Sequence, residues 1–163
     1  MLNLKDKIAI VSGCGSIGDG FGNGRAIATL LARQGAKVIG MPCNTAHSGK
    51  IIAEIKNMPK NVQFINMISE VVKCIQKKYP RAKRIGLLAT SGTISSRVYN
   101  KEIDKNGLFT VLLSDRDQKQ LIDDAIYNEK IGIKSNSNPV HDDAKMKISL
   151  AMKKLSIKKP DVI

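Results

Sequence analysis

The sequence predicts an α/β protein in which helices cover both faces of a parallel sheet. Short apolar runs of strand length alternate with helical patterns throughout the 163 residues, and this βαβα order is typical of parallel sheets. Hydrophobic residues make up 42% of the chain, which is enough to build a core. Because aromatic residues make up only 4%, aliphatic side chains must supply most of the packing.

In the first half of the chain, three strands and three helices are expected. Gly35 is a typical stop at the end of the first helix, and Pro80 ends the third. Ser48 is a candidate cap for the second helix. The expected strands are 7–12, 37–41 and 62–65, and the expected helices are 23–34, 48–56 and 67–78.

In the second half, the apolar run 84–89 is the clearest buried strand. A helix is expected over 117–129 because its apolar residues recur three and four positions apart. These apolar residues are Leu121, Ile122, Ala125 and Ile126. Further helices are expected over 93–102 and 142–155, with a strand over 108–113, and 160–163 resembles the start of another strand.

The stretch 79–82 is the best candidate for a domain boundary. It divides the chain into an N-terminal α/β lobe, residues 1–82, and a second α/β lobe, residues 83–163. Each is expected to be an incomplete Rossmann-like lobe. Ligands in parallel sheets bind beyond the carboxyl ends of the strands. Cys43 and the Thr90–Thr93 turn both follow predicted strands, so both are expected at that edge.

The formal net charge of +13 is large, and a nucleic acid is one class of partner that it would suit. The lysines are spread along the chain, however, and no aromatic residues accompany the basic clusters, whereas stacking on bases requires aromatic rings. A solvated lysine-rich surface without nucleic-acid binding is therefore favoured. No apolar run approaches the length of a membrane span, so no membrane partner is expected. Three cysteines without a CxxC pair favour a reducing, cytoplasmic location.

Cys43 is the most informative residue of the chain. It follows an apolar, β-prone run and precedes a predicted helix, so it is expected near a helix amino terminus. Backbone N–H groups and the helix dipole favour the thiolate at such a place, and the thiolate is the reactive form. Asn44 and Thr45 add hydrogen-bonding groups beside it, and His47 adds a titratable group. The alternative is a small buried cysteine in a turn.

A glycine-rich loop, residues 13–25, follows the first predicted strand and opens the first predicted helix. Glycines in such a loop let backbone N–H groups approach a diphosphate closely. Residues 1–40 resemble the opening of short-chain dehydrogenases/reductases, with Gly13, Gly22 and Gly24 matching that family's spaced glycines. This resemblance implies an NAD(P) cofactor. Because no acidic residue ends the second strand to hold a ribose hydroxyl, a turn without a ligand is favoured.

Three further motifs occur in order along the rest of the chain. They are Met41 to His47, Phe64 to Ile68 and Arg84 to Ile94, and Tyr99 follows them. From about residue 37 onward, the chain resembles the aspartate/glutamate racemase family. The resemblance implies an isomerase of amino-acid metabolism that uses no cofactor and acts on a small acidic amino acid, such as aspartate or glutamate. Members are often dimers, so the resemblance also implies a homodimer.

In that family two cysteines flank the α-carbon of the substrate. One thiolate removes the α-proton, and the other thiol returns a proton on the opposite face. The resemblance makes Cys43 one of these acid/base groups, while His47 is expected to orient or pack rather than to bind a metal. The residues to which the resemblance assigns substrate binding are Asn44, Thr45, Thr90, Gly92 and Thr93.

The chain departs from the family at the second cysteine. The family carries that cysteine in a Gly-Cys-Thr-Glu motif after a strand, and the 163 residues contain no such motif. Neither Cys14 in the glycine loop nor Cys74, which is expected in the core, fits its role. The chain by itself is therefore expected to have weak or no racemase activity. The two resemblances meet near Gly40, which suggests a joined or truncated reading frame. An NAD(P)-binding oxidoreductase fragment and a noncatalytic amino-acid-binding module are the alternatives.

Overall fold

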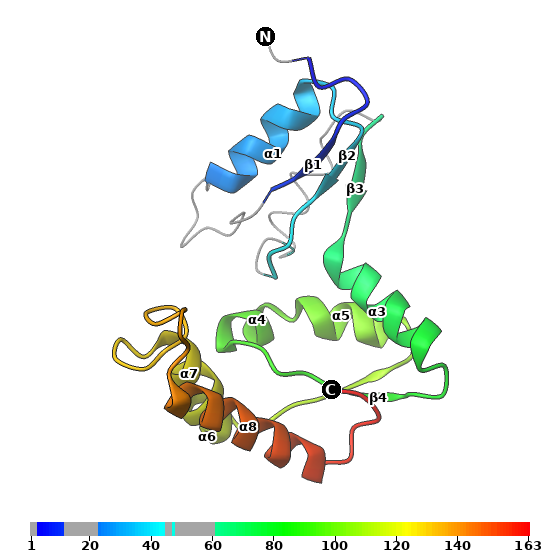
Figure 1. Ribbon diagram of the computed structural model, residues 1–163. Helices are drawn as coiled ribbons and strands as arrows, with labels where there is room; N and C mark the ends of the chain where they lie inside the picture. The colour runs from blue at the N-terminus through cyan, green and yellow to red at the C-terminus, as the bar shows by residue number, and fades with distance from the viewer. Residues whose placement is uncertain (1–2, 12–22, 45–46, 48–60) are drawn as a thin grey trace. The chain divides into compact units, whose positions relative to one another are not determined.

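The computed structural model describes residues 3–11, 23–44, 47 and 61–163. Within them, the chain forms the α/β fold that the sequence predicts, with parallel strands and helices (Figure 1). It divides into two compact units. Unit 1 consists of Met1–Cys74 with Ser96–Val98, and unit 2 consists of Ile75–Ser95 with Tyr99–Ile163. The predicted lobe boundary at residue 82 stays a prediction.

Unit 1 contains a three-stranded parallel sheet in the order β1-β2-β3. The strands are β1 (Ile8–Ile10), β2 (Val38–Gly40) and β3 (Gln63–Ile65), and helix α1 (Asn23–Arg33) connects the first two. Gly35 ends α1 as predicted, because its φ of 97° is one that glycine adopts without steric cost. The Ala36 amide then donates 3.1 Å to the Leu31 carbonyl and closes the helix end.

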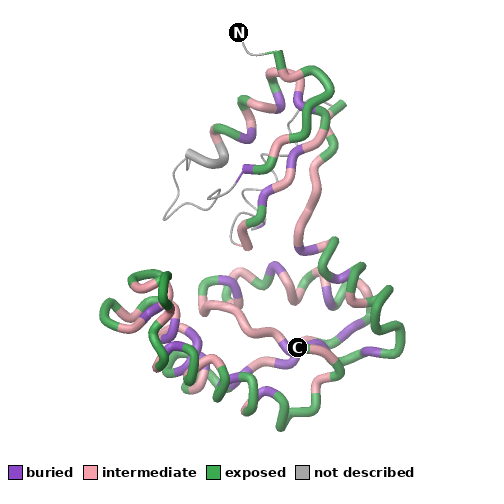
Figure 2. Tube along the Cα trace, in the orientation of Figure 1, coloured by how far each residue is buried: buried purple, intermediate pink, exposed green. Residues whose placement is uncertain are grey.

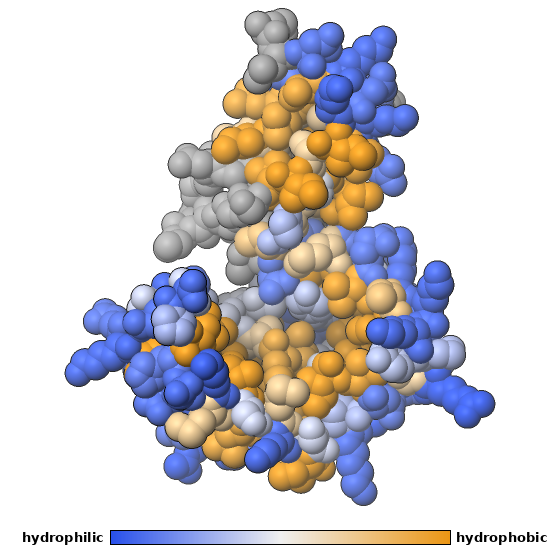
Figure 3. Space-filling model, in the orientation of Figure 1, coloured by the Kyte–Doolittle hydropathy of each residue, from blue (hydrophilic) through white to orange (hydrophobic). Residues whose placement is uncertain are grey.

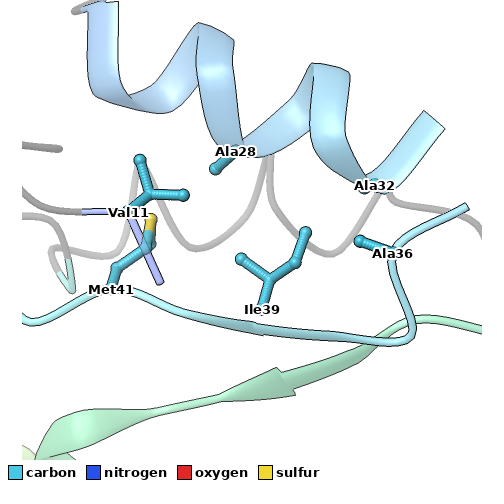
Figure 4. Packing of buried hydrophobic residues seen from close by; sticks show 6 residues of the cluster. All are labelled: Val11, Ala28, Ala32, Ala36, Ile39 and Met41. Carbon is cyan, nitrogen blue, oxygen red and sulfur yellow. The ribbon is translucent and has the colours of Figure 1, made fainter. Parts of the chain in front are cut away.

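The core of unit 1 lies between α1 and one face of this sheet. Ala28 and Ala32 of α1 face Ile39 of β2, and Val11 and Met41, which directly follow β1 and β2 (Figure 4). The small alanine side chains let the helix approach the sheet closely, so that Ile39 is 0% exposed.

The other face of the sheet carries exposed apolar side chains. Successive strand residues point to opposite faces, and Ile8 and Ile10 are 72% and 77% exposed. Figure 3 shows apolar side chains gathered over these strands. A groove of about 520 Å³ lies on this face and is closed on one side by residues 67–74 of α3 (Met67–Lys78).

Unit 2 is built on a second parallel pair, β4 (Arg84–Gly86) with β5 (Phe109–Val111). The end of the chain joins this sheet, because Val162 forms a parallel bridge with Ile85. The Gly86 amide donates 2.7 Å to the Val162 carbonyl. The helical elements are α4 (Ser91–Ser96), α5 (Val98–Lys105), α6 (Asp115–Asp117), the π-helix η2 (Gln118–Asp123), α7 (Asp124–Tyr127) and α8 (Asp142–Ile157).

The core of unit 2 is formed where α8 packs on the strands and on η2. The buried residues of α8 are Ala144, Ala151 and Leu155, and the rest of the helix is exposed or of intermediate burial (Figure 2). The core cluster comprises Val111, Leu113, Leu121, Ile122, Ala151 and Leu155.

Two predicted helices are divided in the structure. The helix expected over 93–102 is interrupted at Arg97, whose φ of 54° is incompatible with a continuous right-handed helix. The helix expected over 117–129 is present as α6, η2 and α7, with one π-helical turn in its middle. The helix expected over 48–56, with its Ser48 cap, lies outside the described residues. Among the described residues, no helix has the length and apolarity needed to cross a membrane.

Substituting Ile39 by alanine should cost about 2–5 kcal/mol in the free energy of unfolding, because it opens a cavity between α1 and the sheet. Ile8→Ala is the matched control, since the same side chain is removed from the exposed face of the same sheet. We expect this control to cost at most about 0.5 kcal/mol. Urea unfolding measures both. Equal losses would mean that the face carrying Ile8 is also covered in solution.

Candidate functional site

Cys43 follows β2 at its carboxyl end, as the sequence predicts. Met41 directly after the strand is buried in the α1 core. The chain then turns at Pro42, where the Cys43 amide donates 2.8 Å to the Met41 carbonyl. Cys43 is half-buried and packs against the same core cluster. Asn44 is also half-buried, and Thr45 lies outside the described residues.

His47 connects this loop to the beginning of α3 through hydrogen bonds. Its Nδ1 lies 2.8 Å from the Cys43 carbonyl oxygen, and its Nε2 lies 3.1 Å from the Met67 amide nitrogen. A carbonyl only accepts and an amide N–H only donates, so the ring carries its proton on Nδ1 and is neutral. The side chain is buried against Phe64, with ring centroids 5.9 Å apart.

Burial lowers the pKa of His47 below its ordinary value of 6.5, and the hydrogen bond to the Cys43 carbonyl opposes this shift more weakly. Because both ring nitrogens are occupied by backbone groups, the imidazole provides neither a base for the Cys43 thiol nor a positive charge beside it. His47 therefore orients the loop, which agrees with the role that the sequence predicts for it.

The sequence predicts that Cys74 lies in the core, and the structure shows that this prediction is wrong. The residue is exposed on α3, because the buried stripe of this part of the helix runs through Ile68 and Val72 instead. Cys74 lines the groove on the open face of the sheet, whereas Cys43 packs against the cluster on the α1 face. Cys43 is not among the residues that line this groove. Among the described residues, no three His, Cys, Asp or Glu side chains gather as a metal site would require.

The Thr90–Thr93 turn follows β4 and begins α4. The Thr90 and Thr93 hydroxyl oxygens lie 3.2 Å apart, so two of the residues to which the resemblance assigns substrate binding are in contact. Thr93 is only 3% exposed, whereas Thr90 is half-buried. Gly92 is exposed, and a Cβ built on it meets no atom within 4 Å. The fold therefore does not require glycine here, and the open space leaves the backbone accessible.

Sequence reasoning missed the polar side chains that hold this turn. Asp123 accepts from the Ser91 backbone N–H at 2.8 Å and from the Ser91 hydroxyl. Gln118 donates 2.7 Å to the Ala89 carbonyl. A signal was present for Gln118, because it stands three and four positions before Leu121 and Ile122 on the apolar face. A polar residue on such a face usually has a specific partner.

The glycines of the reductase-like segment are only partly described. Gly24 is the second residue of α1, while Gly13 and Gly22 lie outside the described residues. The NAD(P) reading of this loop stays a prediction.

Lowering the pH from about 7.5 to about 5.5 should reduce the free energy of unfolding, because the unfolded chain protonates His47 more readily than the folded chain does. The stabilisation is fully present above the ordinary pKa of 6.5 and is lost as the pH falls toward the lower pKa of the folded state. His47→Asn should flatten this decline in urea-unfolding measurements across the pH range.

His141→Asn is the control, because His141 is the second of two histidines and is exposed at the start of α8. Asparagine also caps helices well, so this variant removes the other imidazole and keeps a cap on α8. Loss of the decline in His141→Asn instead of His47→Asn would contradict the assignment to His47. An unchanged decline in His47→Asn would assign the effect to another group.

Comparison with known proteins identifies the fold and the family. Two solved structures share the fold: an aspartate racemase homologue from Pyrococcus horikoshii, with 22% identity and a TM-score of 0.61, and an aspartate racemase from Picrophilus torridus, with 23% identity and a TM-score of 0.55. The matches cover 85% and 83% of this chain but 58% and 51% of those chains. The chain thus spans little more than half the length of these relatives.

A family model described as Asp/Glu/Hydantoin racemase matches residues 23–154. The match begins earlier than residue 37, so α1 and β2 fall within it, and no comparison supports a reductase-like segment. It also includes Cys43 and the Thr90–Thr93 turn. Residues 23–154 form most of the chain, and the protein therefore belongs to the Asp/Glu/Hydantoin racemase family.

Proposed function

We propose that this protein acts on a small acidic amino acid, aspartate or glutamate, by cofactor-independent proton transfer at the α-carbon, with Cys43 as the acid/base group. The observation that carries the proposal is the family match over residues 23–154. The family match supports only the broad type of function, that of a racemase. The substrate and the role of Cys43 are proposals for this chain.

The surroundings of Cys43 support this role. The residue lies just beyond the carboxyl end of a parallel strand, where ligands of such sheets bind. It is half-buried rather than sealed in the core. His47 holds the loop around it through the Cys43 carbonyl and the Met67 amide. Such an arrangement can keep a thiol in place for proton abstraction.

Asn44 and Thr45 are proposed to bind the α-carboxylate or the amino group of the substrate. Thr90, Gly92 and Thr93 are proposed to hold a carboxylate through hydroxyl and backbone N–H groups. The half-buried Thr90 and the open Gly92 support this assignment. Because Thr93 is buried and its hydroxyl contacts that of Thr90, its proposed part in carboxylate binding is to position the Thr90 hydroxyl.

One acid/base group allows exchange of the α-proton but does not invert the stereocentre. The Cys43 thiolate removes the α-proton and leaves a carbanion. The resulting thiol exchanges this proton with solvent and returns a solvent proton to the same face, which regenerates the thiolate. Inversion requires a second acid on the opposite face. Cys74 is not proposed for this role, since it lines a groove of unit 1 whose lining does not include Cys43. We therefore propose that this chain exchanges the α-proton with little racemisation.

Incubation with L-aspartate in heavy water should replace the α-proton by deuterium without forming D-aspartate. NMR measures the loss of the α-proton signal, and chiral chromatography measures the product. Cys43→Ser should abolish the exchange, because the serine hydroxyl is far less acidic than a thiol. Cys74→Ser is the matched control and should retain it. Full racemisation by the wild-type chain would contradict the single-base proposal. Aspartate binding without any exchange would favour a noncatalytic binding module.

Gly92→Ala should leave the fold intact and weaken the binding of L-aspartate. The added Cβ meets no protein atom within 4 Å, and alanine is a better helix former than glycine by about 1 kcal/mol. Thermal unfolding should therefore show equal or higher stability. Calorimetric titration should show weaker binding, since the methyl group occupies space beside the backbone. Unchanged affinity would remove Gly92 from the proposed carboxylate site.

A further inference from the structure

Two polar side chains of η2 hold the turn that follows β4. Gln118 Nε2 donates to the Ala89 carbonyl oxygen over 2.7 Å. Asp123 Oδ1 accepts from the Ser91 backbone N–H over 2.8 Å, and Asp123 Oδ2 accepts from the Ser91 hydroxyl. The residues on both sides of Thr90 are thus tied to η2, which fixes Thr90 between them.

Within the turn, Thr93 adds a third constraint on Thr90. The two hydroxyl oxygens lie 3.2 Å apart, and the Thr93 amide donates weakly, over 3.4 Å, to the Thr90 hydroxyl. The Ile94 amide donates 3.0 Å to the Thr90 carbonyl. Both the backbone and the hydroxyl of Thr90 are therefore set before any ligand arrives, which reduces the entropic cost of binding.

The π-helical turn explains how one short element reaches both sides of Thr90. In an α-helix, residues five apart point about 140° away from each other. In a π-helix the hydrogen bonds join residues five apart, so these residues come close to the same side. Gln118 and Asp123 are five apart, and Nε2 of the first lies 3.5 Å from Oδ1 of the second. Single π-turns occur frequently at functional sites.

Gln118 occupies a position that a core built only for packing would give to an apolar residue. It is 6% exposed and lies on the apolar face of the helix. Its Nε2 faces two acceptors, the Ala89 carbonyl and the Asp123 carboxylate, which sets the orientation of the amide. Its Oε1 is buried without a hydrogen-bond partner among the described residues. Leaving such an acceptor buried without a partner lowers stability, so a contribution to stability does not explain this side chain.

On its other side, η2 is anchored to α8. Lys154 pairs with Asp117 just before η2, and Lys147 pairs with Asp124 just after it at 3.1 Å. Lys147 and Lys154 are seven residues apart, which places them on the same side of α8. Both pairs are partly exposed and such pairs contribute little, so the buried residues that η2 shares with α8 are what hold this element in place.

We propose that Gln118 and Asp123 are positioning residues for ligand binding: together they form a clamp that fixes Ala89 and Ser91 so that Thr90 is presented to a substrate carboxylate. This inference rests on the proposed function. Neither side chain contacts the substrate in this proposal, and both act through the turn.

Electrostatics alone predicts the opposite effect on binding, which makes the proposal easy to test. Asp123 is a negative charge close to the proposed carboxylate site, so its removal should strengthen the binding of an anion by Coulomb's law. Its removal also releases Ser91, so the clamp predicts weaker binding. The direction of the change therefore separates the two effects.

The test compares Asp123→Ala with Asp124→Ala in the full chain. Both remove one carboxylate from adjacent helical positions, but Asp124 contacts Lys147 and Asn128 instead of the turn. The first measurement is amide hydrogen exchange of Ser91 by NMR, which requires no ligand. We expect exchange to be about tenfold faster in Asp123→Ala, as loss of one charge-assisted hydrogen bond implies. In Asp124→Ala it should change less than about twofold.

The second measurement is the dissociation constant for L-aspartate, obtained by calorimetric titration below the unfolding temperature of each variant. It should rise about tenfold in Asp123→Ala and remain nearly unchanged in Asp124→Ala. It should recover in part in Asp123→Asn, whose amide oxygen can still accept from Ser91.

Gln118→Met keeps the length of the side chain but removes the donor to Ala89, so it should also weaken aspartate binding. If Asp123→Ala does not fold, Ser91→Ala removes only the hydroxyl arm and should give a smaller rise.

Unchanged Ser91 exchange in Asp123→Ala would overturn the clamp. Faster exchange with unchanged or tighter aspartate binding would overturn the positioning role. If the wild-type chain binds no aspartate while Ser91 exchange still depends on Asp123, the proposed substrate fails and the clamp stands.

Discussion

Parallel strand pairing is the constraint on which the rest of this structure depends. Parallel neighbours cannot be joined by a tight turn, so each strand is followed by a crossover, and every strand in a sheet ends at the same edge. In unit 1 this places the Cys43 loop after β2, and in unit 2 it places the Thr90–Thr93 turn after β4. The residues proposed for chemistry and binding thus follow strand ends. Side chains there do not have to alternate between the two faces of a sheet.

Both loops are held by polar side chains that the sequence pattern leaves inconspicuous. His47 joins the Cys43 carbonyl to the amide that begins α3, and Gln118 with Asp123 joins the turn after β4 to η2. Apart from the contact between His47 and the nearby Cys43, these contacts connect segments 20 or more residues apart. Loops carry unpaired backbone groups, and a buried side chain that satisfies them also fixes the conformation of the loop.

The fold was largely predictable because it follows from short-range signals. Apolar runs marked the strands, and Gly35 and Pro80 marked the helix ends, which agree with the structure to within a few residues. The errors have local physical causes. Arg97 adopts a positive φ that no pattern of apolar residues reveals, and Cys74 lies one position off the buried stripe of α3. The apolar residues over 117–129 recur as they do in a single continuous helix, although a π-turn lies in its middle. The sequence pattern therefore did not predict the π-turn.

The sequence by itself determined the α/β class, the order of the elements, the family resemblance and the position of Cys43 after a strand, because all of these are written in local patterns of residues. Only the tertiary structure decided the neutral, loop-holding state of His47, the exposure of Cys74 and the hold of Gln118 and Asp123 on the turn around Thr90. These depend on which distant backbone groups come within hydrogen-bonding reach, and such distances are set by the packing of whole elements rather than by any stretch of sequence.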